Sequence, residues 1–365
     1  MTKQEQKAKV GSTSLQQDEA GGRLFQGVLG KFYGNNFLVL ITFAMLVLIY
    51  LVASFIFRSQ NFGSLNSIFS MLHSWPHLVV IAAGMTMVLI SGGIDISVGG
   101  QCAMYCMMFA YFMQADGHNI NFYAMVLIVL VTGLVFGLVQ GVLVAYFEIQ
   151  PFIVTLVGMF FARGLTAIIS EKNIEITNQD FLRFREIKFT LPFGGYTDGG
   201  GVYQAPYIYL FAILALMAVF VLYAIMTWTS FGRSVYAVGG SEQSAMLMGL
   251  NPRRVKLKVY ALQGLLTAFG SFLFCLSVPG GAIEKAVAFE MNAIAAAVIG
   301  GALLTGGVGN ILGSLAGTLI QLTILKIIVS VGTLSSGWGP ISTAAMMAFF
   351  IAMQSVLTKS RRKRE

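Results

Sequence analysis

The sequence predicts an all-α, polytopic integral membrane protein with about ten transmembrane helices. Of its 365 residues, 56% are hydrophobic and only 10% are Asp, Glu, Lys or Arg, and the mean hydropathy is +0.78. A soluble domain carries roughly 25% charged residues, so a soluble enzyme of this composition would expose too much apolar surface. A fibrous or disordered chain is excluded too, because the 41 glycines follow no triplet period and only 7 residues are proline.

Long apolar segments separate the stretches that hold the charge. Each segment is close to the roughly 20 residues that cross a hydrocarbon core as a helix. The two shortest, 96–113 and 290–305, are interrupted by Gly-rich turns. In chain order the expected spans are 37–57, 68–90, 96–113, 122–145, 151–170, 207–228, 259–278, 290–305, 311–331 and 340–357.

Basic residues predict the orientation of these spans. Segments 1–36, 229–258 and 358–365 hold 15 of the 23 Lys and Arg residues, and short loops rich in these residues stay on the cytoplasmic side. Both termini are therefore expected in the cytoplasm, as tails of a transmembrane domain 37–357, with 171–206 as an outer loop. A polar stretch precedes the first span, which predicts a retained helix rather than a cleaved signal peptide. The net charge of +8 reflects this excess of Lys and Arg on the cytoplasmic side, next to the lipid headgroups. It indicates no nucleic-acid partner.

Glycine repeats predict close packing between helices. Small residues at every fourth position let two helix backbones approach each other in lipid, where packing holds helices together. The repeats are Gly133, Gly137 and Gly141, and Gly309, Gly313 and Gly317.

The sequence indicates no metal site, no catalytic residue and no nucleotide-binding loop. Cys102 and Cys106 lie one helical turn apart, but Cys is also an ordinary buried residue, as for Cys275, and no third ligand is near. His73 and His77 flank a proline that breaks or kinks their helix. The Gly-rich runs lack the Lys and hydroxyl residues of a phosphate-binding loop. We therefore expect no cofactor and no ATP hydrolysis in this chain.

Few charged residues lie near the expected membrane core. Asp95 ends a Gly-rich turn and precedes a helix, where it can cap backbone N–H groups or line a substrate path. Glu290 opens a span and is expected to cap it. Arg163 lies deeper and must face protein or a water-filled path, whereas Lys326 is expected to extend toward the interface.

The basic segment 229–258 contains signals for a short surface helix. Ser241 can cap its start, Gly249 can end it and Pro252 prevents its continuation. Ala245, together with Leu247 and Met248, gives it an apolar face. Two interpretations stay open, a knob that fits a groove of a partner protein and a solvated loop at the lipid headgroups.

Three blocks of sequence resemble the monosaccharide permeases of bacterial ABC transporters, the ribose/xylose/galactoside permease group. They are Gly84–Gly99 (GMTMVLISGGIDISVG), Tyr236–Gly240 continuing through Ala245 and Gly249, and Ala293–Gly301. The resemblance covers most of residues 65–357. Within the group, two further stretches look most like a galactofuranose-type permease: Gly158–Gly164, and Gly332–Ser336 with Trp338.

The resemblance implies the ABC importer permease fold and a multi-pass protein of a bacterial inner membrane. It implies import of a monosaccharide such as galactofuranose, ribose or fructose, delivered by an extracytoplasmic sugar-binding protein that docks on 171–206. ABC ATPase subunits, which carry the ATP and Mg²⁺, would grip the cytoplasmic loop. A second permease subunit completes the path, with a heterodimer favoured over a homodimer. The family commonly has Asp where this chain has Asn292, so a role that needs that carboxylate is in doubt.

Two sets of site residues follow from the polar residues and the resemblance. The candidate substrate path is Asp95, Ser97, Arg163, Gln263, Glu290 and Asn292, and the candidate ATPase coupling loop is Gly239, Gly240, Ser241, Glu242, Ser244, Ala245, Gly249 and Asn251. The expected mechanism is alternating access coupled to the partner ATPases. The alternatives are an ion-coupled secondary sugar transporter, and an ABC permease for a nucleoside or a branched-chain amino acid.

Overall fold

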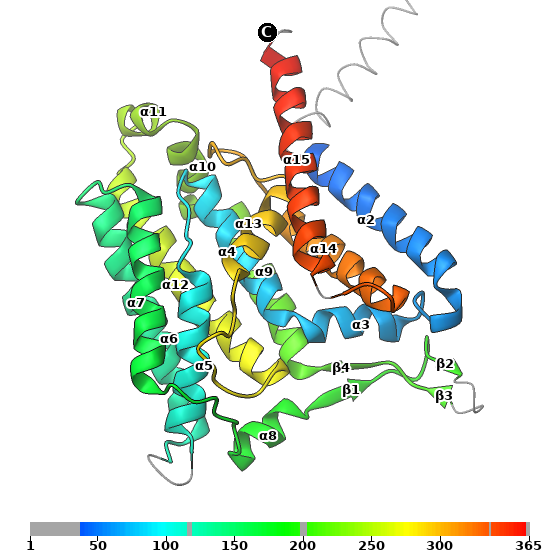
Figure 1. The fold of residues 1–365 in the computed structure, drawn as a ribbon. Coiled ribbons are helices and arrows are strands. Elements are labelled where there is room, and N and C mark those ends of the chain that lie inside the picture. Colours follow the sequence, from blue (N-terminus) through cyan, green and yellow to red (C-terminus); the bar gives the residue numbers. More distant parts are fainter. Residues whose placement is uncertain (1–36, 115–118, 198–202, 336, 363–365) are drawn as a thin grey trace, which may run out of the picture.

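The computed structural model describes residues 37–114, 119–197, 203–335 and 337–362, and most of them are helical (Figure 1). The long or buried helices are α2 (Phe37–Ile56), α3 (Leu65–Ser74), α4 (Pro76–Ile90), α5 (Val98–Phe112), α6 (Phe122–Ala145), α7 (Pro151–Ile169), α9 (Leu210–Trp228), α12 (Pro252–Ser277), α13 (Phe289–Ile299), α14 (Ile311–Val331) and α15 (Trp338–Arg362).

Every expected span contains a helix, but the count of ten is not confirmed. Within the described residues, six helices are each long and apolar enough to cross a membrane: α2, α6, α7, α9, α12 and α14. The bent pair α3–α4 gives at most a seventh. The helices α5 and α13 have 15 and 11 residues, which at 1.5 Å per residue is shorter than a core of about 30 Å. Hydropathy predicted that these two segments are apolar helices, but it did not predict that the helices are too short to cross the membrane.

The expected break between His73 and His77 is present. The helices α3 and α4 meet at Trp75 with a bend of 67°. Pro76 occupies the first turn of α4, where its missing N–H leaves no helical hydrogen bond unmade. Ser64 caps the start of α3 by accepting from the Ser67 N–H.

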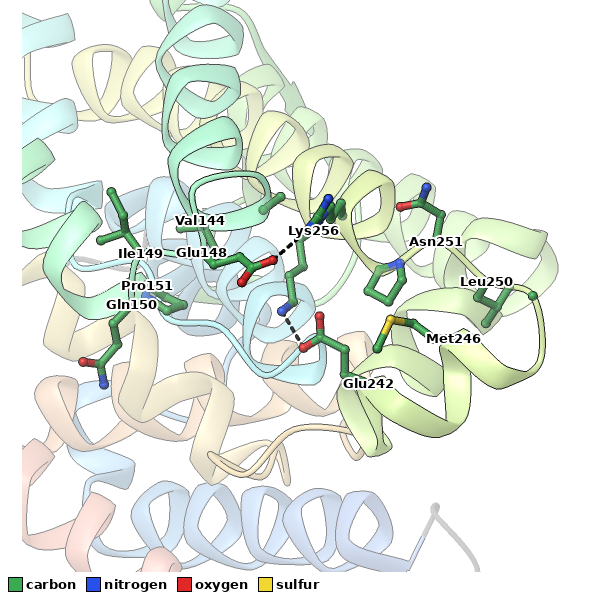
Figure 2. A pocket seen from close by; sticks show the side chains of 14 residues that line it. Val144, Glu148, Ile149, Gln150, Pro151, Glu242, Met246, Leu250, Asn251 and Lys256 are labelled. Carbon is green, nitrogen blue, oxygen red and sulfur yellow. Dashed lines mark hydrogen bonds and ion pairs between the residues drawn. The ribbon is translucent and has the colours of Figure 1, made fainter.

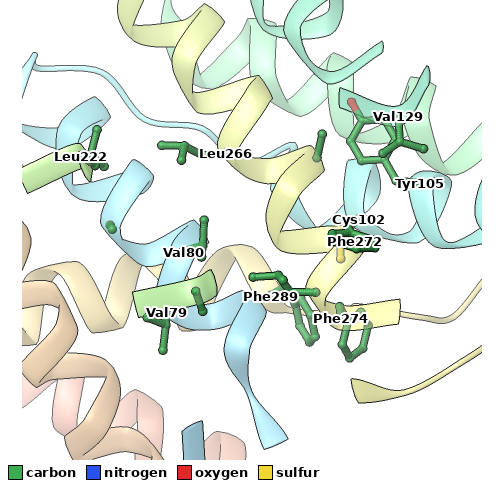
Figure 3. Close-up of a cluster of buried hydrophobic side chains, with 14 of the residues drawn as sticks. Val79, Val80, Cys102, Tyr105, Val129, Leu222, Leu266, Phe272, Phe274 and Phe289 are labelled. Carbon is green, nitrogen blue, oxygen red and sulfur yellow. The ribbon is translucent and has the colours of Figure 1, made fainter. Parts of the chain in front are cut away.

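The helix α4 forms the centre of the molecule, and all of its residues are buried. It packs against α9, α12, α13 and α14, so no side of it faces lipid. A helix that is apolar on all sides is typical of such a buried position. Figure 3 shows part of the surrounding cluster, in which Val79 and Val80 of α4 lie near Leu266 of α12 and Phe289 of α13.

Close glycine packing joins α6 to α12, as the first glycine repeat predicted. A Cβ atom added to Gly137 would overlap the Tyr260 carbonyl oxygen, and one added to Gly133 would overlap the side chain of Ala268. From the other side, a Cβ on Gly264 would overlap the Gly133 carbonyl oxygen. The two backbones are therefore in contact over about two turns.

Shorter elements occupy opposite ends of the bundle (Figure 1). At one end lie α8 (Gln179–Arg185) and four short strands in two antiparallel pairs, β1 (Lys188–Thr190) with β4 (Tyr207–Tyr209) and β2 (Tyr196–Thr197) with β3 (Tyr203–Gln204). At the other end lie α10 (Ser230–Gly240) and α11 (Glu242–Leu247). A single 3₁₀ turn, η1 (Arg58–Gln60), follows α2.

The α6–α12 contact predicts a difference between two glycines. Gly264→Ala should lower the free energy of unfolding by about 1–3 kcal/mol, because the added methyl group forces the two backbones apart. Gly164→Ala on α7 is the matched control, because its Cβ would meet no atom within 4 Å. Thermal unfolding of both variants in detergent measures the difference. Equal stability of the two variants would contradict the close packing.

Candidate functional site

Two helices, α4 and α13, end with the same backbone cap. At the end of α4 the Gly92 N–H donates to Leu89 O (2.9 Å) and the Gly93 N–H to Val88 O (3.1 Å). At the end of α13 the Gly301 N–H donates to Val298 O (2.9 Å) and the Ala302 N–H to Ala297 O (3.0 Å). This is the Schellman motif, in which a left-handed residue, Gly92 or Gly301, satisfies the last carbonyls. The chain thus contains the same C-terminal cap twice, about 209 residues apart. The similar sequences Ile-Ser-Gly-Gly and Ile-Gly-Gly-Ala at these positions could have predicted the repeated cap.

The ends of α4 and α10 and the loop before α14 meet at glycines. The Gly307 N–H donates to the Ile90 carbonyl (2.8 Å). A Cβ added to Gly239, at the end of α10, would overlap that same carbonyl oxygen, and a Cβ on Gly306 would lie 2.7 Å from the Gly239 carbonyl oxygen. We call these residues the glycine junction.

The predicted short helix of the coupling loop is confirmed as α11. Ser241 caps it by accepting from the Ser244 N–H (3.2 Å). Gly249 follows it with φ +82°, and Asn251 caps the next helix, α12, by accepting from the Arg254 N–H (3.1 Å).

The expectation that Ala245, Leu247 and Met248 form one apolar face of α11 is wrong. Ala245 is fully buried against the molecule, whereas Leu247 and Met248 are 90% and 68% exposed. Successive residues on so short a helix point in different directions, so these side chains do not share one face. Ala245 holds α11 in place, and Leu247 and Met248 are its projecting residues.

A groove of about 870 Å³ lies between α11 and the turn from α6 to α7 (Figure 2). Two ion pairs span it: Lys256 to Glu242 (2.7 Å) and Arg253 to Glu148 (2.7 Å). The second pair is largely exposed and contributes little to stability. The apolar part of the lining includes Met246.

Asp95 and Ser97 lie together in a fully buried polar network. The Asp95 carboxylate accepts from the Ser97 N–H (2.9 Å) and from the Ser97 hydroxyl (2.5 Å). Ser97 Oγ in turn accepts from Gln101 Nε2 (2.6 Å) and Gln140 Nε2 (2.9 Å). Asp95 therefore closes an Asx turn before α5 instead of capping the N–H groups of the helix itself. Sequence analysis missed Gln101 and Gln140, although a Gln inside an apolar span is a visible signal.

Arg163 holds a loop instead of facing water. Its guanidinium donates to the carbonyls of Ile283 (2.7 Å), Lys285 (2.7 Å) and Ala286 (3.1 Å) in the loop before α13. Ala286 is one of two alanines there with positive φ, a conformation that an L-residue adopts only when its surroundings enforce it. The cation therefore stabilises a strained backbone.

Glu290 lies in the first turn of α13, where a negative charge interacts favourably with the helix dipole. Its carboxylate occupies the space that a Cβ on Gly99 would fill, so it also lies at the start of α5. Gln263 is buried on α12 against Gly84, and the backbone carbonyl of Asn292 accepts from a Gln on α14. The six path candidates thus fall into an Asp95–Ser97 group, an Arg163–Glu290 group and two separate residues.

Within the described residues, no group of three or more His, Cys, Asp or Glu side chains could hold a metal ion. Cys102, Cys106 and Cys275 are free and buried.

Long apolar helices, two helices too short to cross the membrane and a protruding helical loop are the features of a polytopic membrane transport protein. The chain belongs to the family described as branched-chain amino acid transport system / permease component, whose model matches residues 67–357. It is therefore a multi-pass permease subunit, as the resemblance implied.

Three relatives cover most of the chain. The inner membrane ABC transporter permease protein YjfF of Escherichia coli is 36% identical over 324 residues, 89% of this chain and 93% of the relative. The fructose import permease protein FruG of Bifidobacterium longum is 32% identical over 290 residues, 80% and 83% of the two chains. The ribose import permease protein RbsC of Escherichia coli is 33% identical over 277 residues, 76% and 81%. No solved structure matches the chain.

The Asp95 network predicts different effects for two substitutions. Asp95→Ala removes the acceptor of two buried hydrogen bonds and should lower the free energy of unfolding by about 1–3 kcal/mol. Asp95→Asn keeps an acceptor oxygen and should lower it by less than half as much. Thermal unfolding in detergent measures both, and uptake in vesicles separates the two roles left open by the sequence. A stable Asp95→Asn variant without uptake would assign Asp95 to the path, whereas unchanged stability of Asp95→Ala would exclude the structural role.

Proposed function

We propose that this chain is the membrane-spanning permease subunit of an ATP-driven importer for a monosaccharide, such as galactofuranose, ribose or fructose. The observation that carries the proposal is the similarity over most of the chain to permeases named for fructose and ribose import. A galactose/methyl galactoside import permease, MglC of Escherichia coli, is 30% identical over 323 residues. The shared substrate class of these relatives is a small sugar.

The proposed topology places both termini and α10–α11 in the cytoplasm. ABC ATPase subunits, which hold ATP and Mg²⁺, would contact the exposed Leu247 and Met248 and the groove beside α11. An extracytoplasmic sugar-binding protein would dock on α8 and the strands, which lie at the opposite end of the bundle (Figure 1). A second permease, different from or identical to this one, would complete the path.

In the proposed mechanism the glycine junction transmits movement from the ATPases. ATP binding would bring the ATPases together and displace α11, which Ala245 fixes to the bundle. The end of α10 is in backbone contact with Ile90 and with the loop at Gly306 and Gly307. Because no flexible side chain lies in between, a displacement of α10 would move the end of α4 and the loop before α14 at once. ATP hydrolysis would then reset the permease.

The proposed path passes the two internal polar groups. The Asp95–Ser97 turn and the Arg163–Glu290 loop both lie at the start of α5, and the loop carries the exposed Val287, with the exposed Met291 following on α13. A sugar needs polar partners once it leaves water, because each unpaired hydroxyl is costly. Asn292 and Gln263 supply amide groups farther along α13 and α12.

One other substrate has an observation in its favour. The family description names branched-chain amino acids, although the three relatives with named substrates transport sugars. Uptake assays on the complex reconstituted with its ATPases and binding protein decide between them. We expect uptake of a sugar that vanadate abolishes and an ionophore leaves intact, with no competition by leucine. Uptake that an ionophore abolishes would contradict the ATP-driven mechanism.

The glycine junction provides a sharp test of coupling. Gly239→Ala places a methyl group on the Ile90 carbonyl and should reduce sugar uptake at least about tenfold, which corresponds to about 1.4 kcal/mol. Gly240→Ala is the matched control, because its Cβ would meet no atom within 4 Å. Uptake and ATPase activity of the assembled complex measure the effect.

We expect Gly239→Ala to retain ATP hydrolysis that the binding protein no longer stimulates, since the ATPases themselves are unchanged. Gly240→Ala should behave like the wild type. Full uptake by Gly239→Ala, or equal loss in both variants, would exclude the junction as the route of coupling.

A further inference from the structure

Two cavities adjoin at the corner between α3 and α14. One is polar, with a volume of about 320 Å³, and the other is apolar, with about 390 Å³. Ser70 and Lys326 line both, so the two cavities adjoin at these two side chains and make one region with a polar half and an apolar half. We call it the α3–α14 groove.

The polar half holds several hydrogen-bond donors and one positive charge. Its lining includes Lys326, His73, Ser70, and the amides of Gln60 and Asn61, and none of the described residues that line it carries a carboxylate. The His73 ring stacks on Tyr207 (5.7 Å between centroids), and its Nδ1 is buried without a partner among the described residues. Such a lining suits a negatively charged ligand.

Lys326 is the centre of the groove and keeps its charge uncompensated by the described part of the chain. Its Nζ donates to the Ser67 carbonyl (3.0 Å) and to Ser70 Oγ (2.7 Å), and lies 5.5 Å from the centre of the Phe62 ring. None of the ion pairs between described residues involves it. An ammonium has three N–H donors, so one donor and the full charge remain for a ligand.

The apolar half leads away from Lys326 toward the surface of the bundle. Met71 and Trp75 line it on one side, with Leu325 and Val329 of α14 on the other. Val329 is 78% exposed, so this half opens on the outside of the helices. In a membrane protein that surface faces acyl chains or another subunit.

We propose that the α3–α14 groove binds one anionic phospholipid, with the phosphate on Lys326 and an acyl chain along the apolar half. Charge complementarity favours an anion, and charge-assisted hydrogen bonds from Lys and hydroxyl groups hold phosphates well. The adjacency of a polar and an apolar half favours a lipid over a free sugar or phosphate, which would leave the apolar half unfilled. Lys326 lies five residues from the end of α14, and long basic side chains near the ends of membrane helices extend toward the headgroups.

Native mass spectrometry of the delipidated, full-length permease in its complex tests the proposal. Phosphatidylglycerol and phosphatidylcholine with the same acyl chains are added separately. We expect one retained phosphatidylglycerol per permease chain and a preference of about fivefold over phosphatidylcholine, as a single lysine near a headgroup supplies. Lys326→Gln, which keeps a donor but removes the charge, should abolish the preference, whereas Lys326→Arg should retain it. Lys172→Gln, at an exposed lysine outside the groove, should match the wild type.

A second variant tests the apolar half independently of Lys326. Val329→Glu places a carboxylate where the acyl chain would lie, so it should reduce retention of both lipids. Unchanged retention in Val329→Glu, or an equal preference in the wild type and Lys326→Gln, overturns the proposal.

Other occupants give different results. If excess inorganic phosphate displaces phosphatidylglycerol and stabilises the complex as well as the lipid does, the groove is a site for a soluble anion. If Lys326→Gln leaves lipid retention unchanged but weakens capture of the sugar-binding protein, Lys326 is a docking contact for an acidic side chain. Either result excludes the lipid site, provided that the variants elute as intact complexes.

Discussion

Backbone polar groups inside an apolar bundle must find partners within the protein, and this constraint governs the centre of the molecule. The last residues of α4 and α13, Ile90 and Ile299, are buried, so the last carbonyl groups of both helices lack helical partners. Schellman turns at Gly92 and Gly301 satisfy some of them. The Gly307 N–H satisfies Ile90, and the Tyr260 hydroxyl donates to the Ile94 carbonyl (3.1 Å). The Gly307 and Tyr260 bonds join segments that are far apart in the chain.

The same constraint explains why glycine occupies the contacts between these segments. The Ile90 carbonyl reaches the Gly307 N–H at a place where the backbone of Gly239 passes close by. A Cβ atom on Gly239 would overlap that carbonyl oxygen, so only glycine fits there. The Tyr236 hydroxyl adds a further bond to the Gly309 carbonyl (2.9 Å), so α10 is tied to the start of α14 as well. Satisfying the internal helix ends therefore creates a stiff connection from the surface helices to the core, which is the connection that the proposed coupling uses.

The sequence predicted those features that composition and local signals determine. Apolar length located every helix that spans the bundle, Pro76 marked the break between α3 and α4, and Ser241 marked the start of α11. It did not predict where α5 and α13 stop, because hydropathy measures how apolar a segment is and not its depth in the bundle. The partners of Arg163 were equally hidden, since they are backbone carbonyls about 120 residues away that no side-chain pattern reports.

Cations near the strand-bearing end of the bundle are held by backbone carbonyls. Arg163 bonds three carbonyls of one loop, Lys285 bonds those of Val278 and Gly280, and Arg185 bonds that of Leu276. A carbonyl orients a cation but does not neutralise it, so these residues fix the loops around α13 while their charge remains available to a partner or a lipid. Proton- or sodium-driven transport relies on ionisable groups whose charge changes during the cycle, whereas the guanidinium of Arg163 is bound to three backbone carbonyls and holds a loop. Such an arrangement suits a permease whose movement is driven from α10 and α11. In such a permease the cations at the opposite end need only fix the loops and let them move, without changing their own charge.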